Sequence, residues 1–265
     1  MAAQALVSLS VFTRLDHSSR PQLLTQRVTT VAVQYAGFGC DVRPTLSFSV
    51  MSVTSALPRA QAIARILELT AHPEVTGTRP WLVVTVGLPG SGKSTFARRL
   101  ARATGAAVLE SDGLRRALFP RASHGAAESK QLFDALYGAA SRLLEDGVSV
   151  VVDATNLRER DRVRAYEVAE GVGVPVLLIH FRAPERVIAE RLSKRGAGAD
   201  PEDSSTAGLS VYMMLAETEE PVTREHWKID TSDVDATEAA LQRAIETLTT
   251  QPRPAVGRHT GGSNS

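Results

Sequence analysis

One stretch of this sequence decides the fold: Trp81-Leu82-Val83-Val84-Thr85-Val86-Gly87-Leu88-Pro89-Gly90-Ser91-Gly92-Lys93-Ser94-Thr95. It opens with an apolar run, which is typical of a central parallel strand that helices cover on both faces. The part from Gly87 to Ser94 matches a phosphate-binding loop, with glycine at its first and sixth positions and then lysine and serine. A helix is predicted from Ser94 to Thr104. This order of strand, loop and helix indicates nucleotide binding and disfavours a glycine-rich turn without a ligand.

The residue types of the loop suit contact with phosphate. Glycine lets the backbone wrap closely around phosphate oxygens. The amides that begin the next helix point at the anion, and the helix dipole favours negative charge there. We expect Lys93 to reach the β- and γ-phosphates of ATP and the Ser94 hydroxyl to ligate Mg²⁺. The predicted nucleotide contacts are Gly87, Leu88, Pro89, Gly90, Ser91, Gly92, Lys93, Ser94 and Thr95.

The composition describes a globular chain without a strong charge. Of its 265 residues 43% are hydrophobic and 22% are charged, which suffices for a full core. The formal net charge of +1 gives no general attraction to nucleic acid or to an anionic membrane. No apolar stretch is long enough to span a bilayer. A single cysteine, Cys40, excludes an intrachain disulfide and is compatible with the reducing cytoplasm, where we expect the protein.

Strand and helix patterns alternate through most of the chain. Further strands are expected at 107–109, 148–152, 174–181 and 227–230, with helices between them. This predicts a three-layer α/β domain with a parallel sheet. We assign residues 80–250 to this domain, which contains the phosphate-binding loop. Around it we expect a poorly structured extension (1–55), a helix and linker (56–79) and a disordered tail (251–265).

The first 50 residues allow two interpretations. They are rich in Ser, Thr and Val with scattered arginines, which loosely resembles an organellar transit peptide. The segment shows no sustained helical or strand period. We therefore favour an over-long reading frame in which translation starts at Met51.

Two aspartates follow predicted strands. Ligands of open parallel sheets bind beyond the carboxyl ends of the strands, so Asp112 and Asp153 are expected to face the phosphates. Asp112 is a candidate to accept the proton of an acceptor hydroxyl, and the N-cap of a helix at 114–119 is an equally good interpretation. Arg115 lies one helical turn further and can face the same site, the alternative being a solvated surface arginine.

Asp153 ends an apolar run, as a Walker B aspartate does. We expect it to reach the Mg²⁺ shell through water, and a cap or turn residue before Thr155-Asn156 is the alternative. No glutamate follows Asp153, which argues against a motor-type ATPase.

A cationic helix is predicted after the fourth strand. It carries Arg186, Arg191, Lys194 and Arg195 ahead of Gly196-Ala197-Gly198. Such a hinged flap could close over the transferring phosphate and stabilise its charge. From spacing alone a solvated helix, with Glu185 and Glu190 as ion-pair partners, is slightly favoured.

Four motifs in this order resemble a known family. They are Gly87–Ser94, Ser111–Arg115, Asp153–Leu157 and Arg191–Gly196. Together they resemble the AAA-type P-loop kinases related to the kinase domain of phage polynucleotide kinase, with zeta-toxin kinases as more distant relatives. The resemblance implies a five-stranded parallel sheet of the nucleotide-kinase type with a helical lid. It also implies transfer of the γ-phosphate of ATP to a hydroxyl.

The resemblance also implies roles for single residues. Asp112 matches the general base and Arg115 the arginine near the acceptor phosphate. Asp153 matches the aspartate after the third strand. Arg195, with Arg191 as the alternative, matches the lid arginine on the transferred phosphate. The phosphatase domain of polynucleotide kinase has no counterpart, and the segment 119–130 shows no nucleic-acid signature.

These residues predict an ATP- and Mg²⁺-dependent kinase with an alcohol as acceptor. Three hypotheses stay open for its partner. In the first, the acceptor is a polynucleotide 5′-hydroxyl, which the net charge does not support. In the second, the acceptor is a small molecule such as a sugar, nucleoside or antibiotic. The third is a regulatory ATPase without an acceptor. A basic groove beside Asp112 would favour the first hypothesis and a closed pocket the second.

Overall fold

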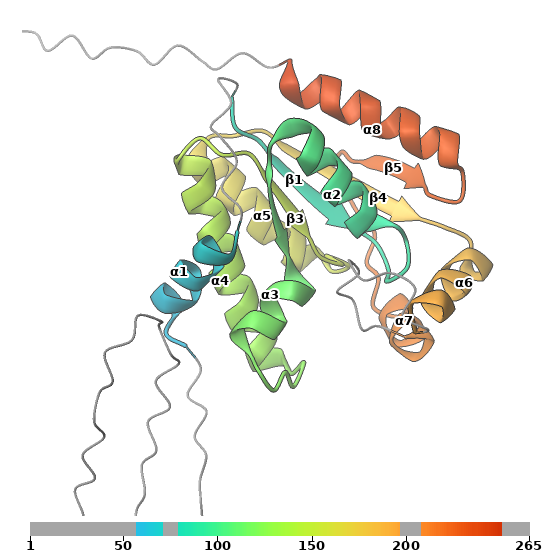
Figure 1. The fold of residues 1–265 in the computed structure, drawn as a ribbon, viewed down its shortest axis with the longest axis horizontal. Helices are drawn as coiled ribbons and strands as arrows, with labels where there is room; N and C mark the ends of the chain where they lie inside the picture. The colour runs from blue at the N-terminus through green and yellow to red at the C-terminus, as the bar shows by residue number, and fades with distance from the viewer. Residues whose placement is uncertain (1–56, 71–78, 197–207, 251–265) are drawn as a thin grey trace, which may run out of the picture. The chain divides into compact units, whose positions relative to one another are not determined.

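A computed structural model describes residues 57–70, 79–196 and 208–250 (Figure 1). The predicted extension, most of the linker, the tail and the Ala197-Gly198 part of the hinge lie outside these residues. So does the side chain of Arg195.

The centre of the described structure is a parallel sheet of five strands in the order β2-β3-β1-β4-β5. Strand β1 pairs with β3 on one side, Leu82 opposite Val150, and with β4 on the other, Leu82 opposite Val176. This confirms the predicted five-stranded parallel sheet. The strands are β1 (Leu82–Val86), β2 (Ala107–Glu110), β3 (Val150–Asp153), β4 (Val176–Arg182) and β5 (Trp227–Asp230).

Helices cover both faces of this sheet (Figure 1). Helices α2 (Lys93–Thr104) and α8 (Val234–Thr249) lie on one face, and α1 (Arg59–Leu69), α4 (Ala126–Glu145) and α5 (Glu159–Val172) pack on the other. Successive side chains of a strand point to opposite faces. Val83 accordingly packs with α2 and α8, whereas Val84 packs with α4 and α5. This double burial explains the uninterrupted apolar run of β1.

Three further helices lie at the carboxyl edge of the sheet. Helix α3 (Ser111–Leu118) follows β2, and α6 (Glu185–Gly196) and α7 (Leu209–Ala216) lie together after β4 (Figure 1). Helix α7 is strongly apolar in sequence, yet none of its residues is buried. Among the described helices, none is both long and apolar enough to cross a membrane.

Candidate nucleotide and acceptor site

The phosphate loop joins β1 to α2 in a conformation that requires glycine. Gly87 has φ 143°, and a Cβ atom there would lie 2.5 Å from the carbonyl oxygen of Phe181 on β4. Gly92 caps α2 with φ 87°, and a Cβ there would press on Thr231 at 3.1 Å. Side chains are strained in this left-handed region. The loop geometry is therefore imposed by the neighbouring strands as well as by its own residues.

Two polar side chains of the phosphate loop are buried. Lys93 is the first residue of α2 and is 7% exposed, and its Nζ donates a hydrogen bond to the Leu88 carbonyl at 2.9 Å. The Ser91 hydroxyl is buried and has no hydrogen-bond partner among the described residues. Buried polar atoms without a partner are costly. A ligand oxygen in the loop would supply the missing partner, so the loop fits a phosphate.

Hydrogen bonds connect the carboxyl ends of β1 and β3, and the residues that follow them, beside the phosphate loop. The Gly87 amide donates to the Thr155 carbonyl at 3.0 Å, and the Asn156 side-chain amide donates to the Thr85 carbonyl at 2.8 Å. The Thr85 hydroxyl lies 3.3 Å from the Asp153 carboxylate. Asn156 has φ 45°, a conformation that asparagine tolerates better than most residues. The loop after β3 thus holds Asp153 against the phosphate loop.

Asp153 is 3% exposed and is the last residue of β3. Its burial raises its pKa, against the effects of the nearby Lys93 ammonium and a hydrogen bond with the Ser94 hydroxyl. A bound cation would offset the cost of this buried charge. A hydroxyl and a carboxylate are oxygen ligands that suit Mg²⁺, which also takes ligands from substrate phosphates. Ser94 and Asp153 fit that ion, although no group of three metal-ligating side chains gathers in the described part of the chain.

Asp112 is not a helix cap. Helix α3 begins at Ser111, three residues earlier than predicted, and its N-cap is Glu110, which makes no capping side-chain bond. Asp112 lies in the first turn and lines a cavity that also contains Lys93 and Ser94. The N-cap interpretation of Asp112 is therefore wrong. Its carboxylate stands at the positive end of the α3 dipole.

Glu110 is a residue of this cavity that the sequence reasoning missed. It ends β2 directly opposite Asp153 in the parallel register. Burial, followed by the charge of Asp153, raises the pKa of Glu110 to about 7, against the opposing charge of Arg98. Its position at the end of a strand, the same signal that singled out Asp153, could have revealed it.

The raised pKa of Glu110 predicts a pH-dependent stability. Its pKa is about 7 in the folded protein against 4.5 ordinarily, so the folded state holds more protons between these values. The carboxyl group therefore destabilises the fold progressively as pH rises from 4.5 to 7. We expect Glu110→Gln, without Mg²⁺, to raise the melting temperature more at pH 8 than at pH 5. The exposed Glu145→Gln is the control, and an equal change at both pH values would contradict the prediction.

Arg115 is buried, so the surface-arginine interpretation is wrong. Its Nη1 lies 2.5 Å from Glu128 Oε1, and both side chains are 10% exposed. Glu128 also accepts hydrogen bonds from the backbone amide (2.6 Å) and hydroxyl (2.8 Å) of Ser123. Burial acts to raise the Glu128 pKa, but these hydrogen bonds hold it at about 2. Arg115 therefore lines the cavity as half of an ion pair whose partner stays ionised.

The cavity has a volume of about 890 Å³. It extends from the phosphate loop across the start of α3 to the walls that α4, α5 and α7 provide. Lys93, Ser94, Asp112, Arg115 and Asp153, predicted separately from the sequence, all line this one space.

Helix α6, the predicted lid, contacts the phosphate loop through Arg191. Its Nη1 donates to the carbonyl of Gly90 (3.2 Å) and to the hydroxyl of Thr231 (2.8 Å). The Thr231 hydroxyl in turn donates to the Ser91 carbonyl at 3.0 Å. Arg195 lies in the last turn of α6, with its side chain outside the described atoms. Lys194 pairs with Glu190 at 2.7 Å, as expected of a solvated helix.

Comparison with known proteins supports the fold. A protein-family profile described as an AAA domain matches residues 82–221, just over half of the chain. Uncharacterized proteins of Mycobacterium tuberculosis strain H37Rv and of Mycobacterium bovis are each 30% identical over 151 residues. The match covers 52% of this chain and 30% of each relative, so the chain spans about a third of the length of these relatives.

Two solved structures with bound nucleotide show the same fold. The APS kinase of Mycobacterium tuberculosis, in complex with AMPPNP and APS, has a TM-score of 0.51 and 21% identity, covering 64% of this chain and 98% of that one. Kti12 of Chaetomium thermophilum, in complex with ADP-AlF3, has a TM-score of 0.51 and 22% identity, covering 63% and 98%. At these identities the likeness shows a shared architecture.

Proposed function

The chain belongs to the AAA domain family, and from this premise we propose that it is an ATP-dependent kinase that phosphorylates an acceptor hydroxyl. One observation carries the proposal: the phosphate loop and Asp112 line a single cavity. A nucleotide-binding switch needs the loop alone. A carboxylate that lines the same space provides what transfer to an alcohol additionally requires. We assign this activity to residues 80–250.

Each residue has a proposed role in the transfer. The loop amides and Lys93 would hold the β- and γ-phosphates. Ser94 together with Asp153 would hold Mg²⁺, which would neutralise phosphate charge. An Asp112 carboxylate oxygen accepts the proton of the acceptor hydroxyl. The hydroxyl oxygen then bonds to the γ-phosphorus, and ADP leaves. Arg195 on the lid stabilises the charge of the transferred group.

Arg191 has a different proposed role from Arg195. Its guanidinium already binds the backbone carbonyl of Gly90 and both oxygens of Thr231. We therefore assign it to the support of the phosphate loop, beside the nucleotide, and leave contact with the transferred phosphate to Arg195.

A transfer screen with γ-labelled ATP tests the proposed function. The acceptors are single-stranded oligonucleotides and a panel of small alcohols, with Asp112→Asn as the control protein. We expect label to move from ATP to an alcohol in the wild type and far more slowly in the variant. Release of free phosphate alone, at equal rates in both proteins, would instead indicate a regulatory ATPase.

A further inference from the structure

The acceptor side of the cavity carries five arginine and lysine side chains, and four of them have an acidic partner. The pairs are Arg115 with Glu128, Lys130 and Arg164 with Asp134, and Arg160 with Asp161, at 2.5 to 3.8 Å. A polynucleotide binds to lysine and arginine side chains that neutralise its phosphates and so release the counterions bound there. Side chains that already pair with acids contribute less to such binding. This wall is largely neutralised by its own acids, so it does not form a basic groove for a polynucleotide.

Arg158 is the fifth cation and differs from the others. It is half-buried and lines the cavity, and its guanidinium makes no hydrogen bond or ion pair with any described residue. Its backbone carbonyl accepts from the amides of Asp161 (3.0 Å) and Arg162 (3.3 Å) at the start of α5. The backbone is thus anchored while the guanidinium is available to a ligand.

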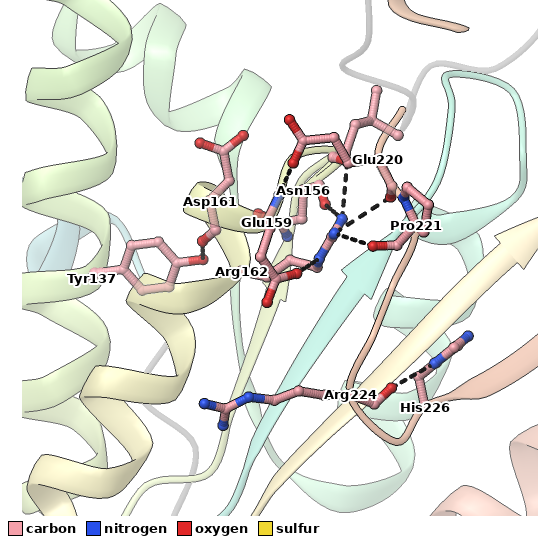
Figure 2. A network of polar contacts seen from close by, with 10 residues as sticks. Tyr137, Asn156, Glu159, Asp161, Arg162, Glu220, Pro221, Arg224 and His226 are labelled. Carbon is pink, nitrogen blue, oxygen red and sulfur yellow. Dashed lines mark hydrogen bonds and ion pairs between the residues drawn. The ribbon is translucent and has the colours of Figure 1, made fainter. Parts of the chain in front are cut away.

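A buried arginine fixes the chain on both sides of Arg158. Figure 2 shows the Arg162 guanidinium, which is fully buried, among backbone carbonyls of two segments. It donates to Asn156 (3.0 Å) and Leu157 (2.9 Å), which directly precede Arg158, and to Pro221 (2.8 Å) from the segment after α7. The backbone that carries Arg158 is therefore fixed. Binding of a ligand to its guanidinium would not require the backbone to become ordered, which lowers the entropy cost of binding.

Part of the cavity lining is apolar. Val211, Met214 and Leu215 of α7 and Phe133 of α4 line it. Met214 is 60% exposed, and no residue of α7 is buried against the protein. A volume of about 890 Å³ lies in the range of pockets for small ligands. This wall can cover the carbon skeleton of an acceptor whose polar groups face the arginine.

We propose that the acceptor is a small alcohol that also carries an anionic group, and that Arg158 binds this group. The inference rests on the proposed kinase function and specifies its substrate class. Asp112 faces the hydroxyl, Arg158 pairs with the carboxylate or phosphate, and the α7 wall covers the carbon atoms between them. A charge-assisted hydrogen bond to Arg158, the one cation of this wall without a side-chain partner among the described residues, selects the anionic molecule over its neutral counterpart.

Matched pairs of acceptors test this inference. The carboxylate pair is glycerate and glycerol, and the phosphate pair is adenosine 3′-monophosphate and adenosine. Label transfer from ATP and calorimetric binding to the ADP–Mg²⁺-loaded full chain are measured for each compound. We expect at least one anionic compound to bind and react at least about tenfold better than its neutral partner. In Arg158→Gln its KM rises about 10- to 100-fold, while the KM for ATP is unchanged.

Arg160→Gln is the matched control, because Arg160 lines the same wall but already pairs with Asp161. We expect it to keep the anionic preference. The inference fails if neither anionic compound is preferred, if Arg158→Gln weakens both members of a pair equally, or if oligonucleotides are the better acceptors. In these cases transfer to some alcohol can persist, whereas failure of the kinase function itself appears as no transfer to any acceptor.

Discussion

Asp112→Asn is expected to lower the rate of γ-phosphate transfer by about 100- to 10,000-fold while ATP affinity stays nearly unchanged. The amide has the size of the carboxylate, so the first turn of α3 keeps its geometry, but it cannot accept a proton from the acceptor hydroxyl. The loop residues that hold ATP are untouched. Single-turnover transfer and equilibrium ATP binding, measured on the same preparation, separate the two effects.

The control for this experiment is Asp161→Asn. Asp161 lines the same cavity from α5, where its carboxylate pairs with Arg160 rather than facing the phosphate loop. We expect its loss to change transfer little. An Asp112→Asn protein with wild-type transfer would remove Asp112 from the chemistry and leave nucleotide binding as the role of the cavity.

Lys93→Ala is expected to weaken ATP binding by about 100-fold or more and to abolish detectable transfer. The ammonium group is buried at the start of α2 and lies inside the loop, where it would make several charge-assisted hydrogen bonds to phosphate oxygens. Alanine supplies none of these. Calorimetric titration with ATP and Mg²⁺ measures the loss of affinity directly.

Lys228→Ala serves as the control, because Lys228 is an exposed lysine of β5 that does not line the cavity. Both variants should keep the melting temperature of the wild type within a few degrees. Unchanged ATP affinity in a folded Lys93→Ala protein would refute the assignment of the phosphate site, and with it the proposed kinase.

The strands and the phosphate loop were predictable because their signals are local. The apolar run of β1 reflects helices on both faces, and the spacing of Gly87, Gly92 and Lys93 reflects a loop that wraps an anion. Element ends moved by a few residues, as for α3. That small shift mattered, because it changed Asp112 from a candidate cap into a residue of the first turn.

The partners of the charged residues were not predictable. The sequence left Arg115 as either a surface arginine or a contact to the acceptor. Its ion pair with Glu128 depends on how α4 packs beside α3. No sequence motif singled out Arg158. Its lack of a partner among the described residues, and the carbonyls that fix its backbone, depend on Arg162 and on the segment after α7.

The sequence by itself determined the nucleotide-binding part of this protein, because short-range spacing specifies a strand, a loop and the helix that follows it. It also placed Asp112 and Asp153 at the ends of strands, where parallel topology brings them to one rim. Only the tertiary structure decided which charges on that rim pair with one another and which one has no side-chain partner among the described residues. Ion pairing depends on distances of a few ångströms between segments far apart in the chain, and no local pattern encodes those distances.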